Sequence, residues 1–119
     1  MPRRSAAKTA LPALALRAIS KLGSDVAMAR RRRRIPQRLM AGRMLVSLQT
    51  LQRLEAGDPS VGLSVLASAL FTLGMVARLG ELIAPESDTG GAIEDLARVP
   101  KRARQPRQGR AAGAVNLDF

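Results

Sequence analysis

Few side chains in this sequence are suited to catalysis. The chain has no His and no Cys, so proton transfer near neutral pH would depend on nine carboxylates. Glu94 and Asp95 are adjacent, so on a helix they would point in different directions, while Glu55 and Asp58 flank an expected turn. The absence of Cys also excludes disulfides, zinc knuckles and thiol chemistry. We therefore expect no enzyme, no cofactor and no metal site.

Arginine is the residue type that indicates a function, because its guanidinium group binds phosphate. The net charge is +11, and no acid occurs between Asp25 and Glu55. That window contains Arg30 to Arg34, Arg38, Arg43 and Arg53. An uninterrupted basic segment implies a polyanionic partner. The chain has two Phe and no Trp or Tyr, which disfavours the stacking of single-stranded bases and leaves double-stranded DNA as the expected partner.

The elements that must position these arginines are helices. Apolar residues at spacings of three and four, with few β-branched or aromatic residues, predict an all-α fold. The expected helices span residues 12–34, 36–43, 48–56, 60–74 and 75–83. Gly23 followed by Ser24 allows a second interpretation in which the first helix is divided, and Ser47 is an expected N-cap. The fifth helix carries apolar side chains that offer a dimer surface.

Composition divides the chain into three parts. We expect a flexible basic N-terminus at 1–11, a DNA-binding domain at 12–83 and a disordered C-terminal tail at 84–119 with a short helical candidate at 91–98. The basic start has the order of a targeting peptide, but its apolar run is short and is interrupted by Pro12. No segment has the ~20 apolar residues of a membrane span. We expect a cytoplasmic, nucleoid-associated bacterial protein.

The stretch from Pro36 to Gly57 resembles the helix-turn-helix of the Xre or phage-repressor family. Gln37 at the start of the second helix, Met40–Ala41, Val46–Ser47 and Leu54–Glu55–Ala56–Gly57 stand at the family's spacing. The resemblance covers about residues 22–83 and implies a five-helix repressor-like domain. Leu45 stands where the family usually has Gly in the turn, so we expect either a strained backbone there or a different turn.

A narrower resemblance is to HipB-type antitoxins, which repress their own operon and are encoded beside a HipA-like serine/threonine kinase toxin. It rests on Leu22–Gly23, Ala29 to Arg34, Thr50 to Glu55, Gly57–Asp58–Pro59, Leu70 to Gly74 and Pro100–Lys101–Arg102. It implies a repressor that is also an antitoxin, with the kinase as its partner through the tail. The alternatives are a stand-alone Xre-type regulator and a nonspecific basic nucleic-acid-binding protein. In those cases the tail adds only nonspecific DNA affinity.

The resemblance places the helix at 48–56 in the major groove of DNA. It implies base contacts from Leu48, Gln49 and Arg53. Backbone contacts are implied for Gln37, Arg38, Arg43, Ser47, Thr50 and Gln52, although Ser47 and Gln52 can equally serve as a cap and a solvated face. One such module reads few bases, so we expect a homodimer on an inverted-repeat operator.

The resembled fold also implies a buried ion pair between Arg30 and Glu55. The local pattern agrees, because Glu55 ends the recognition helix, where the helix dipole disfavours an acid unless it has a specific partner. Arg30 follows Val26 by four residues and so lies on the inward face of the first helix. The alternative is that both side chains are solvated and Arg30 faces DNA.

Overall fold

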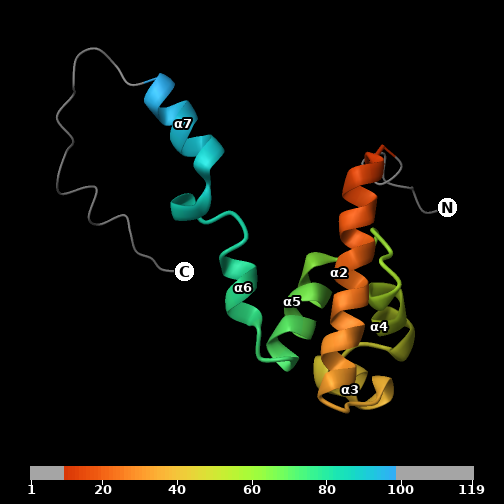
Figure 1. Cartoon of the computed structure of the whole chain (residues 1–119). Coiled ribbons are helices and arrows are strands. Elements are labelled where there is room, and N and C mark those ends of the chain that lie inside the picture. The colour runs from red at the N-terminus through yellow and green to blue at the C-terminus, as the bar shows by residue number, and fades with distance from the viewer. Residues whose placement is uncertain (1–9, 99–119) are drawn as a thin grey trace. The chain divides into compact units, whose positions relative to one another are not determined.

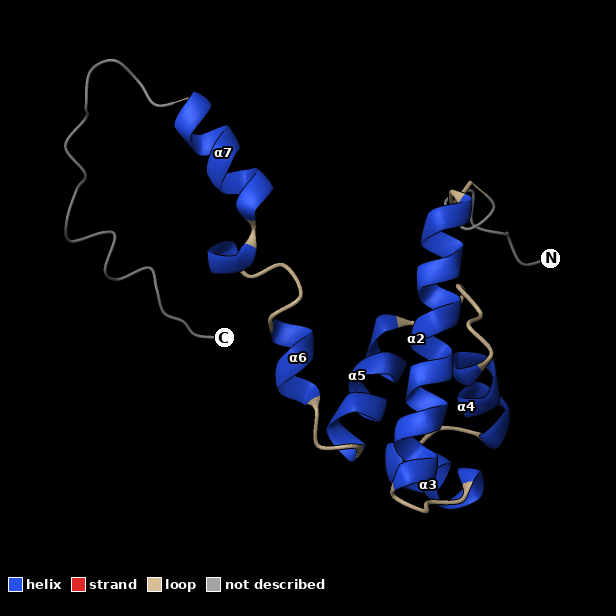
Figure 2. Cartoon of the chain, in the orientation of Figure 1, coloured by secondary structure: helices blue, strands red, loops and turns tan. Residues whose placement is uncertain are grey.

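The computed structural model describes residues 10–98, which form helices and turns without a strand (Figure 2). The helices are α2 (Ala13–Arg32), α3 (Gln37–Met44), α4 (Leu48–Glu55), α5 (Leu63–Thr72), α6 (Val76–Gly80), the 3-10 turn η1 (Pro85–Ser87) and α7 (Thr89–Ala97) (Figure 1). The expected all-helical fold is therefore confirmed for this part of the chain. None of these helices is long and apolar enough to cross a lipid bilayer.

The core is small and joins four helices. Its buried apolar residues are Val26, Met40, Ala41, Met44, Leu51, Leu54, Ala69 and Leu73. Met40 and Leu51 are fully buried. They come from α3 and α4, which pack against each other, while α4 also packs against α2 and α3 against α5. Each of α3 and α4 therefore buries one apolar face and leaves its other residues partly or fully exposed.

Gly23 does not divide the first helix, contrary to the second interpretation of its sequence. α2 continues through it, and Gly23 is buried. A Cβ atom built at this position would lie 2.5 Å from the carbonyl oxygen of Leu54 and 2.8 Å from that of Glu55. The glycine therefore allows the backbone of α2 to touch the last turn of α4, a contact between distant segments that local sequence does not reveal.

The turn between α3 and α4 is built on a strained residue. Leu45 has φ 60° and ψ 40°, the left-handed conformation, and its side chain is 90% exposed. For a residue with a Cβ atom this conformation costs roughly 1–2 kcal/mol. Of the two outcomes expected at this position, the strained backbone is therefore the one that the structure contains.

Two helices differ in their bounds from the prediction. α5 begins at Leu63 and not at Ser60, because Asp58 accepts hydrogen bonds from the backbone N–H and the hydroxyl of Ser60 and holds residues 58–60 in a turn. The fifth helix is shorter than 75–83. α6 ends at Gly80, where turns with i+3 hydrogen bonds replace the helix.

The described residues from Ile83 to Arg98 form a unit separate from the rest of the described chain. Its described part contains η1 and α7, and α7 overlaps the helical candidate at 91–98. The side chain of Asp88 caps α7 by accepting a hydrogen bond from the N–H of Gly91 at 2.9 Å. Most of the N-terminal segment 1–11 and the segment 99–119 lie outside the described residues.

The contact at Gly23 generates a stability prediction with a matched control. Gly23→Ala should lower the free energy of unfolding by about 1–3 kcal/mol, because the added methyl group meets backbone atoms that cannot move aside. Gly42→Ala in α3 should instead raise it by about 0.5–1 kcal/mol, since no atom lies within 4 Å of a Cβ there and Ala favours the helix. Urea unfolding of both variants measures the difference. Equal effects of the two substitutions would contradict the close contact.

Candidate nucleic-acid interface

A buried ion pair connects the first helix to the end of α4. Arg30 Nε donates to Glu55 Oε2 at 2.7 Å and Arg30 Nη2 donates to Glu55 Oε1 at 3.1 Å. The two side chains are 8% and 7% exposed. A third donor, Arg30 Nη1, reaches the carbonyl oxygen of Ile35 at 3.0 Å. The structure thus contains the pair that the resemblance implied, in a two-pronged geometry that leaves neither charge unpaired.

Gln37 extends this pair toward the surface. Its Nε2 donates to Glu55 Oε1 at 2.9 Å, and its Oε1 accepts from Gln52 Nε2 at 3.4 Å, a long and weak hydrogen bond. Glu55 therefore fixes which way the Gln37 amide faces and leaves one N–H of that amide for a ligand. The sequence pattern marked Gln37 and Gln52 as separate candidates but did not indicate that Glu55 links them.

The first turn of α3 has unused backbone donors. Its N-cap is Pro36, which has no side-chain oxygen to accept from them. The first backbone N–H groups of a helix have no partner within the helix, and here the bond from Met40 to Pro36 is the first of the series. These N–H groups and the Gln37 amide lie at one helix end, where the dipole favours an anion.

α4 begins with a hydroxyl pair. Ser47 Oγ accepts from the N–H of Thr50 at 3.1 Å and lies 2.9 Å from Thr50 Oγ1. Ser47 is therefore the N-cap that the sequence predicted. Only one of the two hydroxyl protons is used between them, so the pair keeps one O–H for another acceptor.

Arg53 has partners within the chain. Its Nε donates to Asp58 Oδ2 at 3.0 Å and its Nη2 donates to Ser60 Oγ at 3.0 Å. The backbone N–H of Ser60, its hydroxyl and then Arg53 hold the pKa of Asp58 well below its usual range. The sequence assigned Arg53 to a DNA base, whereas here its guanidinium is directed to the loop after α4. An acid two residues before Ser60 was the signal for this turn.

The remaining candidates stay open to solvent. Gln49, at the second position of α4, is exposed, and Leu48 beside it is half-buried. Arg38 and Arg43 on α3 are also exposed, and within residues 10–98 neither forms an ion pair. No three side chains in the described part of the chain come together as metal ligands. The arrangement is suited to holding phosphate groups and to presenting one flexible amide beside them.

Comparison with models of protein families, with curated proteins and with solved structures found no match.

The buried pair generates a prediction for stability. Arg30→Ala and Glu55→Ala should each lower the free energy of unfolding by about 3–5 kcal/mol, because each strands the opposite charge in the interior. Arg31→Ala, next in the chain but exposed, should cost under about 0.5 kcal/mol. Denaturant unfolding of both single variants and of the double variant gives the coupling energy of the pair. Additive effects of the two substitutions would show that the side chains do not interact.

Proposed function

We propose that the chain is a sequence-specific DNA-binding transcriptional repressor, in which α3 and α4 act as a helix-turn-helix. One observation carries this proposal. Glu55 is the acid that ends the arginine window, and its charge is buried against Arg30. The surface formed between Asp25 and Glu55 is therefore positive throughout, as binding to the phosphates of double-stranded DNA requires.

The proposed contacts divide into phosphate and base contacts. The free N–H groups of the first turn of α3, together with the amide of Gln37, bind a phosphate oxygen. Arg38 and Arg43 add charge at that backbone, and the O–H that Ser47 and Thr50 retain reaches a neighbouring phosphate. Gln52 contributes by steadying Gln37, with which it shares a hydrogen bond.

Base reading is proposed for the N-terminal part of α4. Gln49 is exposed and makes no side-chain hydrogen bond to a described residue, so both its amide donor and its acceptor are available to an adenine edge. Leu48 lies beside it for contact with a thymine methyl group. Arg53 reaches a guanine or a phosphate only by releasing Asp58, so we assign it the smaller share of the discrimination.

A finer proposal is that this repressor is the antitoxin of a HipA-like kinase. It rests on the sequence resemblance and on α7, where Ile93 and Leu96 are 65% and 73% exposed, so this short helix offers apolar side chains to a partner. Such a protein would act at the bacterial nucleoid in the cytoplasm. A kinase that binds the full chain but not a chain ending at Leu82 would support this proposal. Equal binding to both would leave a stand-alone Xre-type regulator.

The DNA-binding proposal is tested on the promoter of the protein's own gene. Footprinting should show a protected inverted repeat, and binding should weaken steeply as salt rises. Gln49→Ala should reduce the preference for this site over random DNA by about 1–3 kcal/mol, because one bidentate base contact is lost. Titrations at fixed salt measure both affinities.

The control for that titration is Arg31→Ala, which removes one positive charge and no base contact. It should weaken binding to the promoter site and to random DNA alike. Full retention of site preference by Gln49→Ala would overturn the assignment of α4 as the recognition helix. The absence of any site preference in the unmodified chain would favour the nonspecific basic protein instead.

A further inference from the structure

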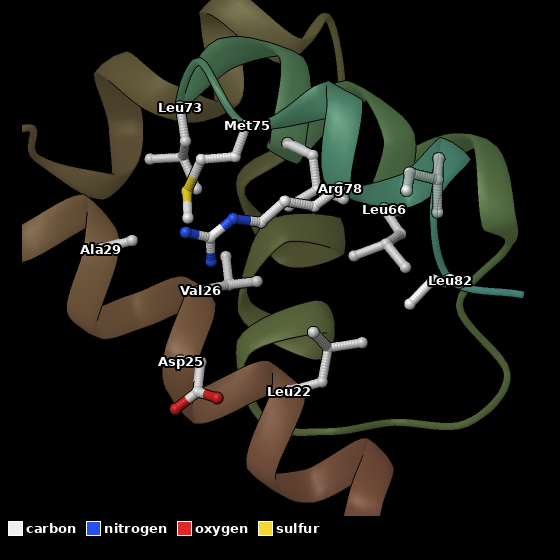
Figure 3. A pocket seen from close by; sticks show the side chains of 11 residues that line it. Leu22, Asp25, Val26, Ala29, Leu66, Leu73, Met75, Arg78 and Leu82 are labelled. Atoms are coloured by element: carbon white, nitrogen blue, oxygen red, sulfur yellow. The ribbon is translucent and has the colours of Figure 1, made fainter. Parts of the chain in front are cut away.

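An apolar hollow of about 240 Å³ opens between α2, α5 and α6 (Figure 3). Val26 and Leu73, both core residues, reach its floor with exposures of 3% and 4%. Leu22 and Leu82 lie at its rim and are 38% and 70% exposed. The core of the domain is thus left open at this side, where ordinary packing would close it.

The apolar face continues beyond this hollow. A second hollow of about 220 Å³ lies between α2 and the segment that leads into α5. Leu22 and Leu66 line both hollows, and Leu63 in the second is 69% exposed. A contiguous exposed apolar surface is a common feature of the sites through which proteins associate.

Charge distinguishes this face from the rest of the domain. The charged side chains that line the first hollow are one acid, Asp25, and one base, Arg78. In Figure 3 the side chain of Arg78 extends from α6 across the hollow toward α2. Its guanidinium group makes no ion pair with any residue between 10 and 98. Asp25 forms an ion pair with Lys21, but both side chains are exposed, so this pair adds little to the stability of the fold. The second carboxylate oxygen of Asp25 can still pair with another cation.

We propose that this face binds a second copy of the chain across a two-fold axis, with Arg78 of each copy pairing with Asp25 of the other. A two-fold interface must be complementary to itself, and the first hollow meets that condition because its lining carries one acid and one base around an apolar centre. Asp58, which lines the second hollow, is already paired with Arg53. Residues 12–83 carry eleven bases and four acids, so two copies repel each other when their arginine-rich surfaces approach. The charges that line the first hollow sum to zero, so two copies can approach through it without this repulsion.

The role of this dimer rests on the proposed function, because the dimer would place two copies of α4 on the two halves of an inverted repeat. The assembly itself is measured without DNA. If the full chain dimerises as described but shows no site preference on DNA, the interface stands and the repressor proposal fails. If the chain binds a specific DNA site as a monomer, the repressor proposal stands and the proposed interface fails.

The first experiment is sedimentation equilibrium of the full chain over a range of concentrations. Arg78→Asp and Asp25→Arg should each raise the dimer dissociation constant by about tenfold or more, because each places like charges opposite one another. The double variant exchanges the two charges and should restore most of the affinity. Arg17→Asp is the matched control. It makes the same charge change on α2 outside both hollows and should leave the dissociation constant nearly unchanged. Circular dichroism checks that each variant is folded.

The second experiment uses the absence of Cys from the sequence. Leu82→Cys introduces a single thiol at the rim, and its alkylation should slow as protein concentration rises through the dimer dissociation constant. Leu45→Cys, at the 90% exposed turn between α3 and α4, should be alkylated at one rate throughout. Because both positions are exposed, neither variant depends on the refolding of a perturbed core.

Several results would overturn the proposal. These are a chain that stays monomeric at all concentrations, a dimer whose affinity Arg78→Asp does not change, and failure of the exchanged double variant to restore affinity. Slower alkylation of Leu45→Cys, with no change for Leu82→Cys, would show that the interface lies at the turn between α3 and α4. Binding of a small apolar dye in the hollow of a monomeric chain would assign the hollow to a different occupant.

Discussion

The arrangement of this domain depends on one buried, two-pronged ion pair. Arg30 on α2 and Glu55 at the end of α4 satisfy each other, and Gln37 on α3 joins them through the same carboxylate. Three helices therefore meet at one acid. Burial makes this interaction sensitive to geometry, because a displaced partner leaves a charge without solvent and without a counterion. Both the need to keep Glu55 paired and the packing of the small apolar core therefore constrain how α3 and α4 lie against α2.

The same pair shapes the electrostatics of the surface. An exposed glutamate at the end of α4 would oppose phosphate, whereas Glu55 is enclosed and neutralised. Asp58 is likewise occupied by Ser60 and Arg53. Both of these acids are thus paired within the protein, while Asp25 and Arg78 line the hollow between α2, α5 and α6. The strongly basic segment and the hollow with balanced charges therefore differ in their electrostatics, although both belong to one small domain.

Local patterns in the sequence were enough to locate the helices that carry the candidate site. The ranges 12–34, 36–43 and 48–56 differ by a residue or two from α2, α3 and α4, because apolar periodicity, Pro36 and the Ser47 cap act over neighbouring residues. The Arg30–Glu55 pair came from a family resemblance, since the two residues are distant in the chain. The partners of Arg53 and the closeness of Gly23 to α4 were not predicted. Gly23 meets α4 only after distant segments have folded together, and the partners of Arg53 depend on the conformation of the turn at 58–60. Residue types alone indicate neither contact.

Gly23 has a consequence for how the gene tolerates change. Every missense mutation that alters one base of a glycine codon introduces a side chain with a Cβ atom, and at this position that atom meets the carbonyl oxygens of Leu54 and Glu55. We therefore expect every substitution reachable in one mutational step at codon 23 to lower the stability of the fold. At codon 42 an added Cβ atom has no other atom within 4 Å. Two glycines that both lie within helices therefore differ in how readily a mutation can replace them.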